Sequence, residues 1–296
     1  MKIRNLIPAA AGTVFLFLLS SCGKVSVDAV DGMPAAARIN IRTSIDALAK
    51  SPQLDENGKG NFSDGDILTV TISGEGFKEM DKEYVTGSTE LWWADLNLPE
   101  ETEDVYFSAC YPAQEAIQDG KFTFTVSPEG ETDLLLAGAV RAEKYSESAV
   151  SLTFRHALHK LIVKYVSDGS VDDETLSAIT TSVKALSSCT IDRVKGELEA
   201  GSASGMATVG NRQGDQVSFL IIPQEKDNVT LEVAMGEITR TFMIPDRAQD
   251  GSPVNMLEGG KVLTVLLSVS SGGIRIDGAQ IEGWEQQGTI TGEIPL

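Results

Sequence analysis

The amino-acid sequence predicts an all-β protein, built as two tandem β-sandwich domains behind an N-terminal signal. Short runs of β-branched and aromatic residues recur at roughly 8 to 15 residue spacing, with Gly and Pro between them. The segments after residue 65 carry no apolar 3.6-residue period sustained over three turns, as an amphipathic helix would require. Hydrophobic residues make up 42% and charged residues 23% of the chain, which is a globular composition.

The chain begins with a secretory signal. Lys2 and Arg4 precede an apolar run from Ala9 to Leu19, which is about half the ~20 residues that a membrane-spanning helix needs. Small residues and then Cys22 follow, the layout of a bacterial lipobox whose thiol is acylated. We therefore predict a signal peptide at residues 1–21, lipidation at Cys22, and a flexible lipid tether and linker at residues 22–37. The alternative is an ordinary secretory signal with a chance cysteine.

The first domain is predicted at residues 38–147, and it opens with a β-strand. Apolar and polar side chains alternate from residue 38 to residue 45, so that Ile39 and Ile41 share one face while Arg38 and Arg42 point away. A long polar loop is expected up to residue 65. Further strands are expected at residues 67–72, 84–86, 90–93, 105–111, 121–126 and 133–138.

The second domain is predicted at residues 148–296, after a charged segment of small residues at 141–148. Residues 155–166 form either a strand throughout or a helical turn that enters one. A short helix is expected at 172–179, with Asp172 or Asp173 as its cap. Residues 196–214 are predicted as a loop because Gly, Ser and Ala dominate there. The other expected strands lie at 149–154, 182–186, 189–192, 216–222, 261–269 and 274–276, with a hairpin turning at Gly236 within 229–244.

The charge and the cysteines exclude several functions. A formal net charge of −19 would repel phosphate backbones, so nucleic acid is excluded as a partner. With Cys22 acylated, Cys110 and Cys189 remain, and two buried free thiols are favoured over a disulfide. The chain has no CxxC or HExxH spacing, so we predict neither a metal site nor a cofactor.

Three further motifs have structural explanations that outweigh chemical ones. His156 and His159 form at most a weak metal pair, and packing or hydrogen bonding is favoured. Asp64-Gly65-Asp66 favours a tight turn over a calcium loop. Trp92 and Trp93 invite a sugar-stacking site, but neighbouring strand residues face opposite ways, so one at least packs in the core. Since no nucleophile and base pair is apparent, the chain is predicted not to be an enzyme.

The order of several short segments resembles one known family along nearly the whole chain, the fimbrillin-like lipoprotein precursors of type V pili in Bacteroidetes. The segments are the lipobox at Cys22, Ile39–Thr43, Asp64–Ile67, Val105–Pro112, Asp133–Ala137, Leu152–Leu161, Phe219–Gln224, Gly259–Lys261 and Ile281–Trp284. The resemblance implies two transthyretin-like β-sandwich domains.

The resemblance also implies a mechanism. After export, an arginine-specific protease would remove the N-terminal strand together with the lipid, and Arg38 and Arg42 are the candidate cleavage positions. Arg42 is preferred because a cut there releases the candidate displaced residues Ile39 and Ile41. The vacated groove would then accept a strand from another fimbrial subunit, since an open sheet edge with an apolar stripe binds an extended chain. The structural alternative is that both arginines are merely solvent-facing strand residues.

Two functions are expected from these features of the sequence. The first is a fimbrial subunit precursor that is lipid-anchored at the outer membrane, joins the fimbrium after processing and contributes to cell adhesion. The second is a monomeric surface lipoprotein that binds a host glycan or protein through its loops and never polymerises. The fate of residues 23–42 separates the two. The tip, shaft or base position stays open, as does the capacity of Thr289–Ile294 to act as a donor strand.

Overall fold

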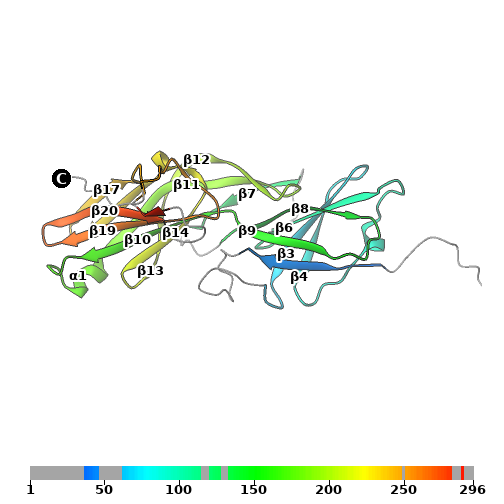
Figure 1. Cartoon of the computed structure of the whole chain (residues 1–296), viewed down its shortest axis with the longest axis horizontal. Helices are drawn as coiled ribbons and strands as arrows, with labels where there is room; N and C mark the ends of the chain where they lie inside the picture. The colour runs from blue at the N-terminus through cyan, green and yellow to red at the C-terminus, as the bar shows by residue number, and fades with distance from the viewer. Residues whose placement is uncertain are drawn as a thin grey trace, which may run out of the picture. The chain divides into compact units, whose positions relative to one another are not determined.

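β-Strands form nearly all the regular structure, which confirms the all-β prediction. The computed structural model describes residues 37–46, 62–114, 120–127, 133–248, 251–281 and 288–289 (Figure 1). Within these ranges the α-helix is α1 (Asp173–Ala178), and η1 (Trp93–Leu96) and η3 (Lys226–Asn228) are single 3-10 turns. Asp172 caps α1 as predicted, because its carboxylate accepts a hydrogen bond of 2.7 Å from the Thr175 N–H.

Residues 38–156, called the first half below, build a six-stranded sheet and a two-stranded ribbon. The sheet order is β2 (Ile41–Ile45), β9 (Val150–His156), β8 (Leu135–Glu143), β6 (Asp104–Tyr111), β3 (Ile67–Ser73) and β4 (Met80–Val85), and the ribbon pairs β1 (Arg38–Ile39) with β5 (Leu91–Trp92). β8 pairs with β9 only over Leu135–Ala137. Beyond that point the backbone ladder between these strands ends. Ile39, Phe107, Leu152 and their neighbours form a buried cluster between these elements.

Residues 159–289, called the second half below, form two further sheets over a second core. One sheet runs β13 (Asn211–Gln213), β14 (Gln216–Ile221), β10 (His159–Ser167), β19 (Val262–Ser270), β20 (Gly273–Ile281) and β21 (Gly288–Thr289). The other runs β12 (Glu197–Val209), β11 (Thr180–Asp192), β16 (Thr230–Met235) and β17 (Ile238–Met243), with β15 (Gln224–Glu225) and β18 (Met256–Leu257) as a separate pair. Leu161, Val183, Leu231 and Val265 are fully buried in the cluster shared by both sheets.

One strand of the first half belongs to a sheet of the second. β7 (Lys121–Thr125) lies in the chain between β6 and β8, yet it pairs antiparallel with Ser188–Asp192 of β11. A third apolar cluster surrounds it, including Cys110, Phe124, Leu136 and Cys189. Ala35–Leu296 form one compact unit. The boundary predicted between residues 147 and 148 stays a prediction, and it falls before β9, which pairs in the first sheet.

The structure corrects several element boundaries. The predicted loop at 196–214 is wrong, because Glu197–Val209 pair with β11 as β12. The strands expected at 182–186 and 189–192 are one 13-residue strand, β11, with two register shifts. β8 continues through the predicted break to Glu143. The segment 155–166 is neither of the two expected forms, because β9 ends at His156 and β10 begins at His159.

Candidate functional site: the N-terminal strand pair

The N-terminal segment inserts apolar side chains into the first core. Exposed and covered positions alternate from residue 38 to residue 45, as the sequence predicts for one strand. Ile39 is 3% exposed and Ile45 is 5% exposed, whereas Ile41 is half-buried. The segment is therefore both a surface strand and a part of the core.

Backbone pairing divides this segment at Asn40. Before it, β1 pairs with β5 with Ile39 opposite Leu91. After it, β2 runs parallel to β9, with Ile41 opposite Val150. The Val150 N–H donates to the Asn40 carbonyl at 2.8 Å, which begins the second ladder. The single predicted strand is thus two short strands with different partners.

β2 is the edge strand of its sheet. The order of the described strands places β9 on one side of β2 and no strand on the other. The ladder ends where the Asp46 N–H donates to the Phe154 carbonyl at 2.9 Å. An edge strand held by one ladder can leave its sheet without breaking another strand pair of that sheet, and this holds for β2 as it does for β4 at the opposite edge.

The two predicted cleavage arginines both reach solvent. Arg38 is 55% exposed at its side chain, and its Nη1 lies 3.1 Å from Oε1 of Glu90. Arg42 is exposed on β2, on the face opposite the core side chains. An ion pair between two half-exposed side chains contributes little stability, so it holds the side chain of Arg38 only weakly.

Loss of the N-terminal segment would uncover a row of apolar side chains. Val150, Leu152 and Phe154 of β9 are at most 2% exposed, and all belong to the first core cluster. Trp93 is also buried there. Its ring lies edge-on to Phe107 at 5.8 Å, and its Nε1 donates to the Ser146 carbonyl at 3.2 Å. Removal of β1 and β2 would therefore leave an apolar stripe along an unpaired edge of β9.

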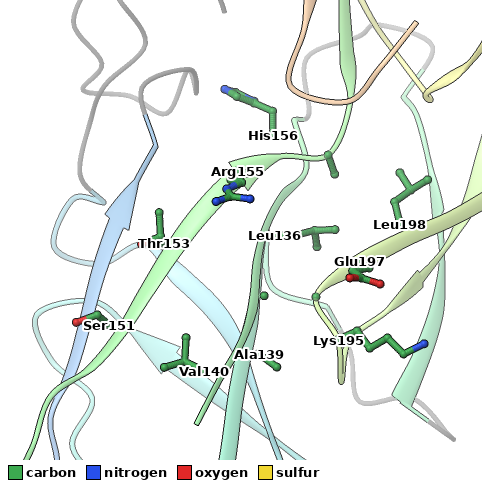
Figure 2. Close-up of a pocket in the computed structure, with 13 residues that line it drawn as sticks. Leu136, Ala139, Val140, Ser151, Thr153, Arg155, His156, Lys195, Glu197 and Leu198 are labelled. Carbon is green, nitrogen blue, oxygen red and sulfur yellow. The ribbon is translucent and has the colours of Figure 1, made fainter. Parts of the chain in front are cut away.

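A pocket of about 430 Å³ adjoins the other side of β9. Figure 2 shows Ser151, Thr153 and Arg155 along β9, with residues of β8 and of the turn between β11 and β12 beside this strand, and all of them line the pocket. The pocket lies where β8 and β9 cease to pair. The Ala139 N–H donates to the Lys195 carbonyl at 3.3 Å, which fixes the turn against β8. The lining combines hydroxyl, charged and small apolar groups, with no aromatic platform among the lining residues.

The two histidines are buried and do not share a site. The Nδ1 of His156 pairs with Oδ2 of Asp133, and the side chain of His156 is 1% exposed. His159 donates from Nδ1 to the Glu258 carbonyl at 2.9 Å. Burial lowers the pKa of His159 to about 4, although this backbone bond opposes the shift. Each histidine has a packing or hydrogen-bonding role, as the sequence favours.

The remaining motifs also have structural roles. Cys110 and Cys189 are buried free thiols, and burial raises their pKa to about 11 and about 12. Asp64-Gly65 form a turn, in which the Ser63 N–H donates to the Asp66 carboxylate at 2.7 Å. Trp93 is buried whereas Trp92 is half-buried, so one tryptophan packs in the core as predicted.

Several predictions fall outside the described residues. These are the signal peptide, Cys22, most of the tether, Trp284 and most of the candidate donor segment Thr289–Ile294. In the part that is described, no three metal-ligating side chains come together. None of the described helices has the length and apolarity to cross a bilayer.

β9 was not predicted from the sequence as the partner of the N-terminal strand, and neither were the pocket residues Ser151, Thr153 and Arg155. The available signal was the strict alternation of Val150, Leu152 and Phe154 with these polar residues, which marks a strand with one face on a core. Alternation alone does not name the neighbouring strand, and this one lies over a hundred residues away.

Comparisons with known proteins identify the family. The chain resembles the crystal structure of a proposed cell adhesion protein from Bacteroides uniformis, with a TM-score of 0.62 and 17% identity over 84% of this chain and 99% of that one. A proposed cell adhesion protein from Bacteroides ovatus matches with a TM-score of 0.58 and 21% identity, over 84% of this chain and 98% of that one. A fimbrial assembly protein from Parabacteroides distasonis matches with a TM-score of 0.50 and 12% identity, over 88% of this chain and 100% of that one. These structures share the fold.

No curated protein sequence matches the chain. The family model described as "Fimbrillin-like" matches residues 57–284, which is most of the chain. With the β-sandwich fold already established, this match shows that the chain belongs to the fimbrillin-like family.

Proposed function

We propose that this protein is a fimbrial subunit precursor that assembles by donor-strand exchange and contributes to cell adhesion. Its family membership supports a pilus-type adhesion subunit at the cell surface. The observation that carries the finer mechanism is the N-terminal segment, which is an edge strand and also fills the first core through Ile39 and Ile45.

Removal of this segment would leave unpaired backbone groups on β9 and uncovered apolar surface in the core, and these two changes are the basis of strand exchange. With a cut after Arg42, the backbone of β9 loses the part of its ladder opposite Ile41 and Arg42, and the core loses the side chain of Ile39. Unpaired backbone groups and uncovered apolar surface both cost free energy in water. An extended strand from another subunit restores both, so the processed subunit is primed to bind one.

The position of the cut decides how much of the groove opens. Cleavage after Arg38 leaves Ile39 and Ile41 attached to the subunit, so the core stays filled. Cleavage after Arg42 releases β1 and the first two residues of β2, including Ile39. Residues Thr43–Ile45 remain opposite Leu152–Phe154. We therefore assign processing to Arg42, and we expect the incoming strand to displace or extend this remaining stub.

Limited digestion tests the proposal. Protein comprising residues 23–296 would be treated with a limiting amount of an arginine-specific protease, and the new N-terminus would be sequenced. We expect one dominant cut after Arg42, followed by a ladder of heat-labile multimers on unheated denaturing gels. Arg42→Lys should abolish both, whereas Arg141→Lys, which changes another exposed strand arginine, should abolish neither.

Other results would change the proposal. A cut without multimers would contradict self-assembly and favour a tip or accessory subunit. A protein that resists cleavage and stays monomeric would contradict strand exchange altogether.

The proposal includes export as a lipoprotein anchored through Cys22 in the outer membrane. In cells fed a labelled fatty acid, the wild-type chain should incorporate label, whereas the Cys22→Ser variant should not. Label on the variant would place the anchor elsewhere.

The alternative function is a monomeric surface lipoprotein that binds a glycan or host protein without catalysis. The pocket beside β9 favours this alternative, because Ser151, Thr153 and Arg155 offer hydroxyl and guanidinium groups to a polar ligand. Binding of the uncleaved protein to a glycan array, with loss of the signal in Thr153→Val, would support this function. Loss of binding after release of residues 23–42 would instead tie it to the processed strand.

A further inference from the structure

β17 (Ile238–Met243) is an exposed edge strand that carries little protection against pairing. It ends its sheet, and among the described strands only β16 pairs with it. Every residue of β17 is exposed except Phe242, which is half-buried, and the side chains of Ile238 and Met243 are each 46% exposed. Arg240 is its one charged residue. By contrast, the edge strand β4 carries Lys82 and the exposed Glu83, and such charges discourage association.

The turn before β17 determines which of its backbone groups face outward. Met235 lies opposite Ile238 across the two-residue turn Gly236-Glu237, and Gly236 has a φ of +61°, as a primed hairpin turn requires. The pair that closes such a turn is hydrogen-bonded, and hydrogen-bonded pairs then alternate along the ladder. The backbone groups of Ile238, Arg240 and Phe242 therefore point to β16. Those of Thr239, Thr241 and Met243 point to the free edge.

We propose that β17 pairs antiparallel with β17 of a second copy of this chain, about a twofold axis through Thr241. Such an axis places side chains of the same face opposite each other, so a residue pairs with one an even number of positions away. Centred on Thr241, the arrangement brings Thr239 opposite Met243 of the other copy. All three outward-facing residues then exchange hydrogen bonds with their counterparts.

The side chains favour this register over the next possible one. Thr241 meets Thr241 of the second copy, a favourable cross-strand pair, and Arg240 lies opposite the ring of Phe242 on each side of the axis. A twofold axis through Arg240 would instead place two guanidinium groups opposite each other and lose one hydrogen-bonded pair. The strand is thus self-complementary in the register centred on Thr241.

A cysteine at the axis tests this register. Opposite residues of a hydrogen-bonded antiparallel pair lie about 5.5 Å apart at Cα, which suits a disulfide. In uncleaved protein comprising residues 23–296, Thr241→Cys should form a covalent dimer under mild oxidation. Thr239→Cys, on the same face of the same strand, should not, because its counterpart is Met243. The native Cys110 and Cys189 are buried, and the unsubstituted protein measures their background. Equal linkage of both variants, or none by Thr241→Cys, would overturn the proposal.

A charge exchange provides a second test that does not depend on oxidation. By sedimentation velocity, the unsubstituted protein should shift from monomer to dimer as its concentration rises. Thr241→Lys and Thr241→Glu should each abolish the dimer, because like charges would meet at the axis, and mixing the two should restore it. Unchanged circular dichroism would show that both variants fold. A protein that stays monomeric at every concentration would overturn the proposal. Uncleaved protein keeps its N-terminal strand, so this failure would leave strand exchange untouched.

Discussion

Arg193 shows how much of this molecule depends on a single side chain. It follows the end of β11, its side chain is 1% exposed, and its guanidinium pairs with the carboxylate of Asp81 on β4. Asp81 also accepts a hydrogen bond of 2.7 Å from Thr71. The Arg193 backbone N–H donates to the Gly120 carbonyl at 2.8 Å, and its carbonyl accepts from Ser108. One residue of the second half therefore binds three segments of the first.

Arg193→Ala should lower the free energy of unfolding by about 3–5 kcal/mol, because it leaves the largely buried carboxylate of Asp81 without its cation. Arg141→Ala is the matched control. Arg141 pairs with Asp104 at 2.6 Å, but both side chains are more than a third exposed, and solvent screening leaves such a pair with little effect on stability. Urea denaturation of the two variants measures the difference. Equal losses would show that the Arg193 pair is not effectively buried.

His159 makes stability depend on pH. The pKa of His159 in the folded protein is about 4, below the ordinary value of 6.5. Between pH 4 and pH 6.5 the imidazole is therefore protonated in the unfolded chain but not in the folded protein. Stability should be complete above pH 6.5 and fall by about 1.4 kcal/mol per unit as the pH drops towards 4. Urea midpoints at several pH values would show a shallower fall for His159→Gln. Parallel curves would assign the pH dependence to other groups.

At the scale of the element, β12 shows why the sequence misled. Its residues are mostly small, which predicts a loop from side-chain propensity. The backbone nevertheless pairs with β11 through much of its length, from Asp192 opposite Glu197 to Ser182 opposite Val209. Whether such a segment forms a strand depends on the strand beside it, and the segment's own residues do not reveal that partner. The N-terminal strand was predictable because its alternation reflects burial on one face, a local signal.

Gly196 joins β11 to β12 and allows no side chain. Its φ is +68°, and a Cβ would overlap the carbonyl of Ala137 on β8. Gly196→Ala should therefore lower the free energy of unfolding by more than the roughly 1–2 kcal/mol expected from the left-handed backbone alone. Gly214→Ala supplies that reference, since Gly214 has a φ of +60° and open space around it. Thermal denaturation compares the two, and equal losses would mean that β8 moves aside.

At the scale of the whole molecule, strands that lie far apart in the sequence pair with one another. The all-β class, the hairpin at Gly236 and the cap at Asp172 were predictable, because each depends on local residue types. The pairing of β7 with β11 was not, since it joins segments about 65 residues apart. The exposure of Arg38 and Arg42 and the burial of Ile39 follow from local alternation, whereas the pairing with β9 does not. The roles of these residues in processing stay a prediction.

We expect the compact unit to unfold in one cooperative transition. β7 completes a sheet of the second half, and Cys110, Leu136 and Cys189 pack in one cluster with it. Fluorescence of the tryptophans, two of which lie in the first half, and far-ultraviolet circular dichroism should therefore report the same urea midpoint. Phe124→Ala, which removes a buried ring of β7, should lower that midpoint. Two separated midpoints in the unsubstituted protein would show that the halves unfold independently.

The pairing of β7 with the distant strand β11 also constrains the order of folding. β7 finds its partner β11 only after about sixty further residues have been made, and β2 waits still longer for β9. Folding that depends on such distant contacts is slow, since loop closure precedes any gain from pairing. A chain that emerges N-terminus first therefore exposes β7 as an unpaired strand for some time. Its sequence Lys121-Phe122-Thr123-Phe124-Thr125 combines aromatic and β-branched residues that aggregate readily. A chain of this topology would benefit from a chaperone that shields β7 until β11 has been made.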